Sequence, residues 1–196
     1  QMEEVRQVAA RFMKVRAVWQ FFEAEREGNA IHLFPWGRPS ACRHTFRFPR
    51  QLRPDGLCLG DYVLEAVEGR RDHVALFVVT AGEGIRERAE KAKQEGRFLF
   101  AHALQALALE TAEAAAEWLH RRIREDWGFP DPPSMTMQER LAARYRGKRY
   151  SFGYGACPNL DHQEGLFRLL RPEEIAVRLT ETMMMDPEAS VSALVF

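Results

Sequence analysis

The longest regular pattern of apolar positions in the chain lies between residues 98 and 127. Apolar residues recur there every three or four positions, which is the spacing of one face of an α-helix. Gly128 and Pro130 follow directly and are typical of a helix end. We therefore predict one long helix, and its buried stripe is expected to comprise Leu104, Ala108, Ala112, Ala115, Leu119 and Ile123.

Strand patterns occur on both sides of this helix. Residues 73–80 (HVALFVVT) form a continuous, β-branched apolar run, which predicts a buried strand. Residues 17–34 place turn residues, Arg26 to Asn29, between two apolar runs and predict a hairpin. The alternative is a helix through Trp19 and Phe22, because their spacing also suits a helix. Residues 177–182 and 190–196 are strand-like.

Shorter helices are predicted over residues 85–94, 135–146 and 165–170, and residues 35–54 are expected to be a loop with a short extended piece. Residues 3–16 are predicted to form an amphipathic helical arm, which packs on its own domain or docks on a neighbour. Its apolar face comprises Val5, Val8, Phe12 and Val15. Because the strands do not alternate with helices, these patterns indicate an α+β domain rather than a doubly wound parallel sheet.

The composition narrows the class of protein. Of the 196 residues, 46% are hydrophobic, which is enough for a packed core. The 28 basic and 28 acidic residues balance, so we expect no nucleic-acid binding. The longest apolar runs are too short to span a membrane, and the acidic start does not resemble a signal peptide. Three cysteines without CxxC spacing favour a reducing, cytoplasmic location.

Several familiar chemical motifs are incomplete. Residues 81–84 (AGEG) follow a predicted strand, but GxGxxG and Gly-Lys-Ser/Thr are both missing, so a plain turn is favoured over a phosphate site. Cys157, Asp161 and His162 lie close together without a second ligand cluster, so we predict no metal site. His102 and His120 lie on the long helix and are expected to be surface or hydrogen-bonded residues rather than ligands.

Residues 149–158 (RYSFGYGACP) fit neither the helical nor the strand period. Gly153 and Gly155 permit unusual backbone angles and a close approach to a ligand. Arg149 offers a guanidinium fork for a carboxylate. Three aromatic rings suit a cationic or planar ligand, namely Tyr150, Phe152 and Tyr154. The segment favours a site for a zwitterionic amino-acid cofactor, and the alternative is an irregular structural loop.

The same segment resembles the RxxxGYxxCP motif of the reactivation domain of cobalamin-dependent methionine synthase, which binds S-adenosylmethionine. Other segments resemble this family in the same order along the chain, from about residue 17 to residue 196. They are CLGDYV at 58–63, the strand ending in VTAG at 79–82, AEAAAEWLH at 112–120 with Trp127-Gly128, LTE at 179–181 and ASVS at 189–192.

The resemblance implies an α+β fold with a mixed, mainly antiparallel twisted sheet, flanked by long helices in a single elongated or C-shaped domain. Residues 17–196 would form this domain, and residues 1–16 would be a helical arm or an interdomain linker. Arg149 would hold the methionine carboxylate, and Asp61 and Glu113 match acidic residues near the cofactor. Backbone and aromatic contacts would come from Tyr150, Ser151, Phe152, Gly153 and Tyr154.

Two departures from the family pattern stand out. Ala143 occupies the position of an acidic residue that the family carries shortly before the arginine motif. The sequence also stops at Phe196, whereas the family continues into residues that contact the nucleoside. We therefore expect a domain truncated at its C-terminus, with a shallow site and modest affinity.

The implied function is reductive methylation of cob(II)alamin to methylcobalamin, with S-adenosylmethionine as the methyl donor. The chain would be part of a methyltransferase of methionine biosynthesis and would lack full activity alone. The implied partners are a cobalamin-binding domain of the same polypeptide and a flavodoxin-like or other one-electron reductant, with no nucleic acid and no membrane. The alternative is a stand-alone S-adenosylmethionine sensor without catalysis, and an adjacent cobalamin-binding DxHxxG segment would decide between the two.

Overall fold

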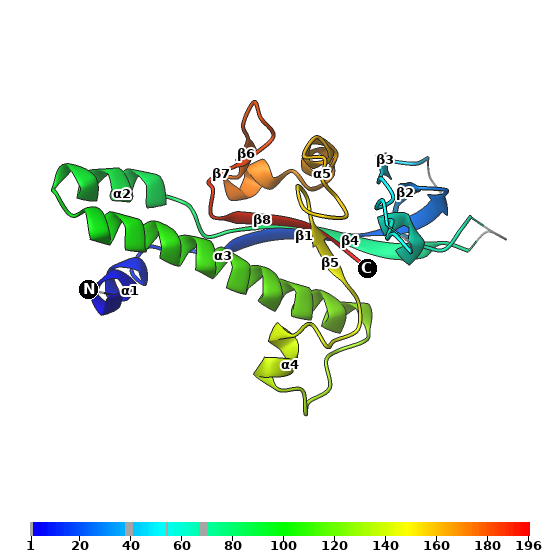
Figure 1. Ribbon diagram of the computed structural model, residues 1–196, viewed down its shortest axis with the longest axis horizontal. Helices are drawn as coiled ribbons and strands as arrows, with labels where there is room; N and C mark the ends of the chain where they lie inside the picture. Colours follow the sequence, from blue (N-terminus) through cyan, green and yellow to red (C-terminus); the bar gives the residue numbers. More distant parts are fainter. Residues whose placement is uncertain (1, 38–40, 54, 67–69) are drawn as a thin grey trace.

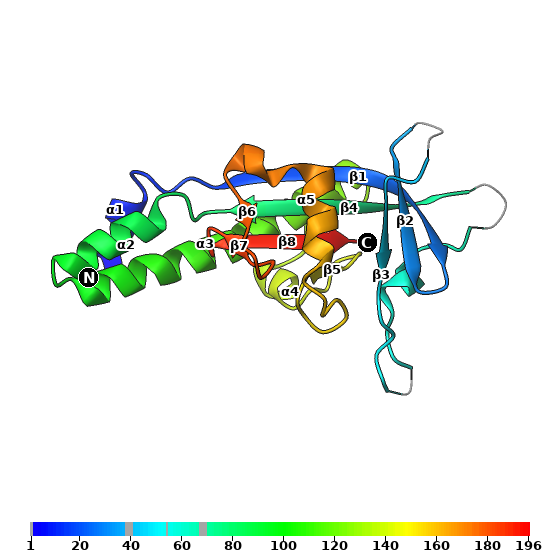
Figure 2. The ribbon, with the colours of Figure 1, turned by 90° about the horizontal axis from the view of Figure 1, so that it is seen from above.

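One antiparallel sheet of six strands organises the molecule, in the order β3-β2-β1-β4-β8-β5. This computed structural model describes residues 2–37, 41–53, 55–66 and 70–196. Strands β1, β4 and β8 run along the length of an elongated molecule, and β2 and β3 turn across them at one end (Figure 2). The strands are β1 (Arg16–Glu27), β2 (Ala30–Pro35), β3 (His44–Arg47), β4 (Asp72–Thr80), β5 (Arg149–Ser151) and β8 (Ser190–Val195).

Helices cover both faces of this sheet (Figure 1). The long helix α3 (Phe98–Trp127) crosses one face, with α1 (Met2–Ala9) and α2 (Ile85–Gln94) packed against its first half. Helix α5 (His162–Leu170) covers the opposite face. The remaining elements are the 3-10 turns η1 (Leu59–Tyr62) and η2 (Pro172–Ile175), the helix α4 (Met137–Leu141), and the pair β6 (Arg178–Leu179) and β7 (Met185–Asp186). The predicted α+β class with a mainly antiparallel sheet is confirmed.

Strand β4 separates two apolar cores. Its alternate side chains Ala75, Phe77 and Val79 pack towards α3, and the side chains between them pack towards α5. A central strand buried on both faces needs apolar residues at successive positions. This explains why the run HVALFVVT shows no polar alternation.

The predicted hairpin is confirmed. Strands β1 and β2 pair from Glu27↔Ala30 outwards, and Gly28 lies in the turn with φ +58°. The competing helix through Trp19 is wrong, because Trp19 pairs with Phe77 of β4 in an extended strand. Pairing on both sides of β1 outweighs the helical spacing of its apolar residues.

The predicted N-terminal helix over residues 3–16 is too long. Helix α1 ends at Ala9, and the chain extends into β1 from Arg16, which pairs with Thr80. Val5 and Ala9 are buried against α3, whereas Val15 is 49% exposed. The strand pairing ends the helical pattern, and a linker role for residues 1–16 stays a prediction.

Other boundaries also differ from the sequence pattern. The predicted strand over 177–182 shrinks to Arg178–Leu179, and the helix over 135–146 shrinks to Met137–Leu141. Helix α5 begins three residues earlier than expected, at His162. These short elements take their ends from contacts with the rest of the fold rather than from local periodicity. Helices α2 and α3 match their predicted bounds.

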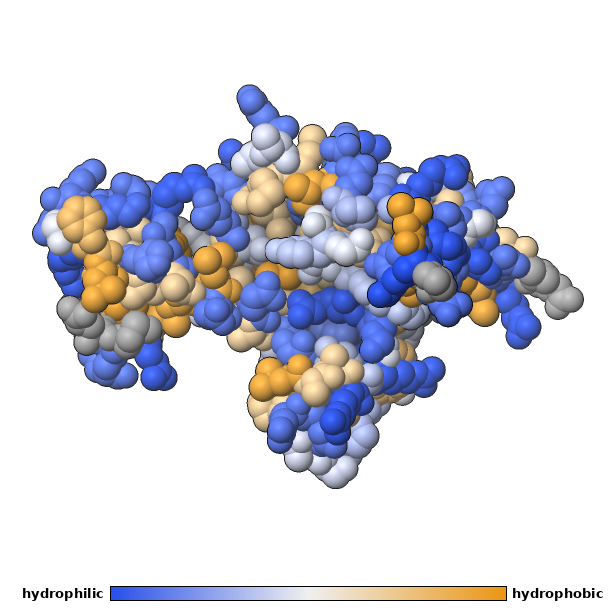
Figure 3. Space-filling view, in the orientation of Figure 1, coloured by the Kyte–Doolittle hydropathy of each residue, from blue (hydrophilic) through white to orange (hydrophobic). Residues whose placement is uncertain are grey.

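The surface seen in Figure 3 is mostly polar, with apolar side chains gathered where α2 meets the start of α3. Phe98 and Leu99 are exposed there, at the first turn of α3. This patch lies at the other end of the long helix from β5 (Figure 1). It is therefore separate from the arginine motif.

The C-terminal end of α3 is fixed by an ion pair in the interior. The Arg124 guanidinium donates two hydrogen bonds, of 2.8 and 2.9 Å, to the carboxylate of Asp131. Both side chains are almost fully buried, at 1% and 2% exposed. The same guanidinium lies 3.8 Å above the ring of Tyr145, and Arg140 reaches Asp131 at 3.4 Å. These contacts hold residues 128–148 against α3 on their way to β5.

We predict that Asp131→Asn lowers the free energy of unfolding by about 3–5 kcal/mol, because Arg124 then loses its buried counter-charge. The matched control is Asp126→Asn, which breaks the exposed pair with Arg122 on the same helix and is expected to cost less than about 1 kcal/mol. Urea unfolding at neutral pH measures both variants. Equal losses in the two variants would contradict a special role for the buried pair.

Candidate functional site

Strand β5, which begins the arginine motif, lies at the edge of the sheet and divides the motif between two faces. Arg149 pairs with Val195 and Tyr150 pairs with Leu194, and these two partners belong to opposite cores. Because side chains alternate along a strand, Arg149 faces α3 and Tyr150 faces the α5 side. The predicted site residues therefore do not form one cluster.

A groove of about 530 Å³ lies beside Arg149, between α3 and the segment that leads to β5. One wall carries three carboxylates of α3, Glu110, Glu113 and Glu117, whose spacing places them on one helical face. The facing wall carries three cationic side chains, Arg140, Lys148 and Arg149. Ala143, at the position where the family carries an acid, also lines the groove. Of the predicted site residues, the structure brings Glu113 and Arg149 together here.

Glu117 is a functional candidate that the sequence analysis did not single out. Its Oε2 atom lies 3.6 Å from Arg149 Nη2 and accepts a hydrogen bond of 3.3 Å from the Tyr145 hydroxyl. Its other oxygen, Oε1, is buried and has no hydrogen-bond partner among the described residues. The available signal was its position four residues after Glu113, which places both on one face of the helix.

His120 lies one helical turn after Glu117 and is fully buried. Neither ring nitrogen has a hydrogen-bond partner within the described part of the chain, and the ring packs edge-on against Tyr145. Burial, together with the positive charges of Arg124 and Arg149, lowers the pKa of His120 to about 3. The expectation of a surface or hydrogen-bonded histidine is therefore wrong here, although it holds for His102, which is exposed.

On the opposite face of β5, the aromatic residues of the motif are already engaged. The Tyr150 hydroxyl lies 2.6 Å from that of Tyr62, and burial together with this bond raises the pKa of Tyr150. Phe152 is buried in the core beside Phe46. Tyr154 differs, because its ring is 74% exposed. Tyr154 is thus the aromatic residue of the motif whose ring faces solvent.

Gly153 has a packing reason to be glycine. Its φ is +88°, in the left-handed region that favours glycine. A Cβ atom at this position would lie 2.8 Å from Cδ2 of Leu160. Ser151, which lies on the α3 side of β5 opposite Ala193, is half-buried and does not line the groove.

Asp61 lies outside the Arg149 groove and lines a separate cleft with Arg26 and Tyr62. Its two carboxylate oxygens accept hydrogen bonds of 2.6 and 2.7 Å from the Arg50 guanidinium. These bonds hold the pKa of the Asp61 carboxyl below its ordinary value, and Arg26 lies 3.7 Å away. The contacts explain Asp61 as an anchor for the loop that carries Arg50.

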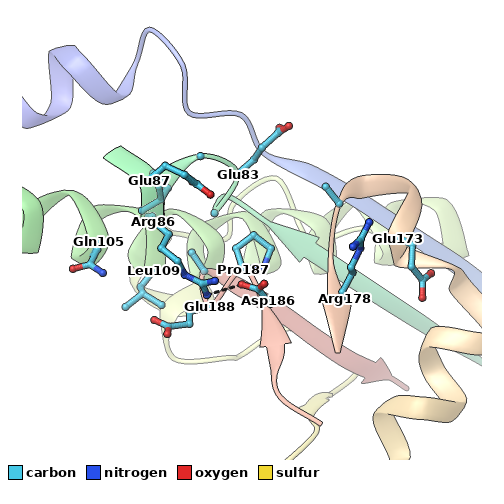
Figure 4. Close-up of a pocket in the computed structure, with 16 residues that line it drawn as sticks. Glu83, Arg86, Glu87, Gln105, Leu109, Glu173, Arg178, Asp186, Pro187 and Glu188 are labelled. Carbon is cyan, nitrogen blue, oxygen red and sulfur yellow. Dashed lines mark hydrogen bonds and ion pairs between the residues drawn. The ribbon is translucent and has the colours of Figure 1, made fainter. Parts of the chain in front are cut away.

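A further cleft, of about 390 Å³, lies between the start of α2 and β7 (Figure 4). Arg86 and Asp186 point towards each other across it and form an ion pair of 2.6 Å. The VTAG and ASVS segments meet beside this cleft, because the Ala81 N–H donates to the Ala189 carbonyl at 2.9 Å and a Cβ on Gly82 would lie 2.3 Å from Pro187 and 3.4 Å from Ala189. No predicted site residue lines this cleft, and these two motifs are explained by packing.

The structure describes residues 2–37, 41–53, 55–66 and 70–196, and we looked there for groups that could bind a metal ion or act as a reactive thiol. Within them, no group of three or more His, Cys, Asp or Glu side chains is placed to hold a metal ion. Cys157 is buried, and burial raises the pKa of its thiol to about 12. In the same residues, no helix has the length and apolar character needed to cross a membrane.

Residues 3–196 match the family model of the vitamin B12 dependent methionine synthase activation domain. The chain belongs to this family. It is 35% identical over 189 residues to methionine synthase of Mycobacterium tuberculosis and 33% identical over 189 residues to that of Mycobacterium leprae. Each match covers 91% of this chain but only 16% of the relative, so the chain spans about a sixth of these enzymes.

A solved structure supports the assignment independently. The crystal structure of the MetH reactivation domain bound to AdoHcy superimposes with a TM-score of 0.89 at 27% identity. The match covers 99% of this chain and 63% of that one. The family inferred from the sequence motifs is confirmed, and so is the fold of the activation domain.

The neutral state of His120 yields a prediction for acid stability. Its pKa is about 3 in the folded chain, against an ordinary value of 6.5, so unfolding takes up a proton between these pH values. Stability therefore falls as pH drops below 6.5. Between about pH 7.5 and about pH 5.5 this single group is expected to remove about 1.4 kcal/mol.

We expect His120→Phe, which keeps an aromatic ring against Tyr145, to abolish that loss. Urea unfolding of the wild type and the variant at both pH values measures the difference. His102→Phe, at the exposed histidine of the same helix, is the control and should behave as the wild type. An identical pH dependence in the His120 variant would contradict the assignment of a buried neutral histidine.

Proposed function

We propose that this chain binds S-adenosylmethionine in the Arg149 groove and presents its methyl group for the reactivation of cobalamin. The observation that carries this proposal is the pairing of a carboxylate wall with a cationic wall in a single groove. A zwitterionic amino acid with an additional sulfonium charge is the kind of ligand that such a groove suits. The similarity to a reactivation domain bound to AdoHcy supports the same ligand class.

The residues present fit the ligand chemically. The Arg149 guanidinium, which is 19% exposed, offers its fork to the methionine carboxylate. Glu113 is exposed on the opposite wall and is our candidate partner for the ammonium group. The surplus of carboxylates on α3 favours a ligand with a net positive charge.

The rest of the motif is proposed to act through its backbone and shape. Tyr154 can place its exposed ring beside the bound ligand. Gly153 lets the chain turn tightly after β5, and Tyr150, Ser151 and Phe152 hold the strand in place. We infer that Asp61 contributes through the loop it anchors, because Arg50 occupies both of its oxygens.

In the proposed reaction, a one-electron reductant would convert cob(II)alamin to cob(I)alamin. The electron pair of cob(I)alamin would form the new bond to the methyl carbon, while the carbon–sulfur bond breaks and leaves its electron pair on sulfur. The products would be methylcobalamin and S-adenosylhomocysteine. The groove residues need only bind and orient the donor, because no proton is transferred. The cobalamin is proposed to come from another domain of the same polypeptide, and the electron from a flavodoxin-like or other reductant. The whole would be a methyltransferase of methionine biosynthesis.

We predict that Arg149→Ala weakens S-adenosylmethionine binding by about ten- to 150-fold, because a charge-assisted carboxylate contact contributes about 1.5–3 kcal/mol. Isothermal titration of the 196-residue chain measures the dissociation constants. The control is Arg144→Ala, which removes the same charge from an exposed side chain outside the groove lining. An unchanged dissociation constant in the Arg149 variant would remove its assigned role.

The catalytic part of the proposal has its own test. A cobalamin domain loaded with cob(II)alamin is mixed with a chemical reductant and S-adenosylmethionine, with and without this chain. We expect the visible spectrum of methylcobalamin to appear faster when the chain is present, because the donor is held in place. Tight binding of S-adenosylmethionine without any acceleration would instead favour a sensor that does no chemistry.

A further inference from the structure

Arg149 meets one carboxylate of the opposite groove wall, that of Glu117, in a partly buried contact. We propose that Glu117 is a positioning residue, which holds the Arg149 guanidinium in the orientation that receives the ligand carboxylate. This inference rests on the proposed function, and it concerns a residue that lies outside the arginine motif. Glu117 acts here through Arg149.

The contact geometry supports a holding role. The nearest approach joins Glu117 Oε2 to one terminal nitrogen of Arg149, at 3.6 Å. A guanidinium has five N–H donors in a planar fork, so this contact leaves other donors available for a ligand carboxylate. The Glu117 side chain is only 28% exposed, whereas Glu113 on the same wall is open to solvent.

Electrostatics give a second argument. The buried ring of His120 lies close to both Arg149 and Arg124, and burial together with these two charges lowers the pKa of that histidine. Without Glu117, the Arg149 cation, which is only 19% exposed, would have no carboxylate within 4 Å among the described residues. The Glu117 carboxylate stabilises this partly buried cation and keeps the guanidinium in the groove wall.

Glu117 is itself held in place. The Tyr145 hydroxyl donates to the same oxygen that faces Arg149, and the Tyr145 ring packs beneath the Arg124 guanidinium. Arg124 is fixed in turn by its two bonds to Asp131. A continuous series of contacts therefore runs from the buried ion pair to the side chain that would meet the ligand.

The experiment compares two probes, S-adenosylmethionine and its decarboxylated form, by isothermal titration. The decarboxylated probe keeps the sulfonium and ammonium groups but lacks the carboxylate that Arg149 receives. We expect Glu117→Gln to weaken binding of S-adenosylmethionine by about tenfold, and to weaken binding of the decarboxylated probe by less than about threefold. Glu117→Asp should restore part of the loss for S-adenosylmethionine.

If Glu117 acted only by attracting the positive charge of the ligand, the two probes would show the opposite order of losses. The decarboxylated probe carries one more net positive charge, so removal of a nearby carboxylate would then weaken it more than S-adenosylmethionine. The control is Glu110→Gln, which removes the same charge from the same wall at a residue without an ion pair within 4 Å in the described chain. Tyr145→Phe removes only the hydroxyl that orients Glu117 and should reproduce the probe preference in weaker form.

Three results would overturn the inference while the proposed function stands. Each compares Glu117→Gln with a wild type that binds. The variant could bind both probes unchanged, it could bind S-adenosylmethionine more tightly, or its affinity for the decarboxylated probe could fall as much as or more than its affinity for S-adenosylmethionine. Tighter binding would mean that Glu117 competes with the ligand for Arg149. A wild type that binds neither probe would overturn the proposed function and this inference together.

Discussion

The buried ion pair between Arg124 and Asp131 is the constraint on which the groove depends. Burying two charges is costly unless they are paired, and here two bonds of 2.8 and 2.9 Å pair them, while Arg124 Nη1 has no hydrogen-bond partner among the described residues. The pair ties the loop after α3 to the helix itself, and Tyr145 packs against the same guanidinium. The segment that follows leads to the edge strand β5, which pairs with β8. Arg149 reaches its place opposite α3 because this path is fixed.

The proposed ligand groove would let a chain with no net charge recognise a charged ligand. Carboxylates recur on one face of α3, and the basic side chains come from the segment that folds back across it. The two signs lie on opposite walls rather than mixed along one surface, and they meet where Glu117 approaches Arg149 to 3.6 Å. A field that is strong locally but cancels over the whole molecule suits a small zwitterion better than a polyanion.

Motifs that mark the family do not all mark the ligand site. Gly82 is packed against Pro187, so the VTAG segment needs a residue without a side chain. Asp61 holds Arg50 through two short hydrogen bonds, and Phe152 lies in the core. Conversely, Glu117 and Tyr145 lie outside the arginine motif, yet they contact each other beside Arg149. A residue type can be required by packing or by ligand binding, and the sequence pattern looks the same in both cases. The contacts in the structure distinguish the two.

Periodicity alone determined the bounds of α2 and α3, the β1–β2 hairpin and the buried strand β4, because local spacing and turn chemistry are enough to specify such elements. The arginine motif also singled out Arg149 and the helix motif Glu113, which line one groove in the structure, and their role in binding stays a prediction. The end of α1 at Ala9, the division of β5 between two faces and the burial of His120 were decided by the tertiary structure. The reason is physical: strand pairing and burial join residues that are distant along the chain. The partnership of Glu117 with Arg149, 32 positions apart, exists only once α3 and β5 have packed together.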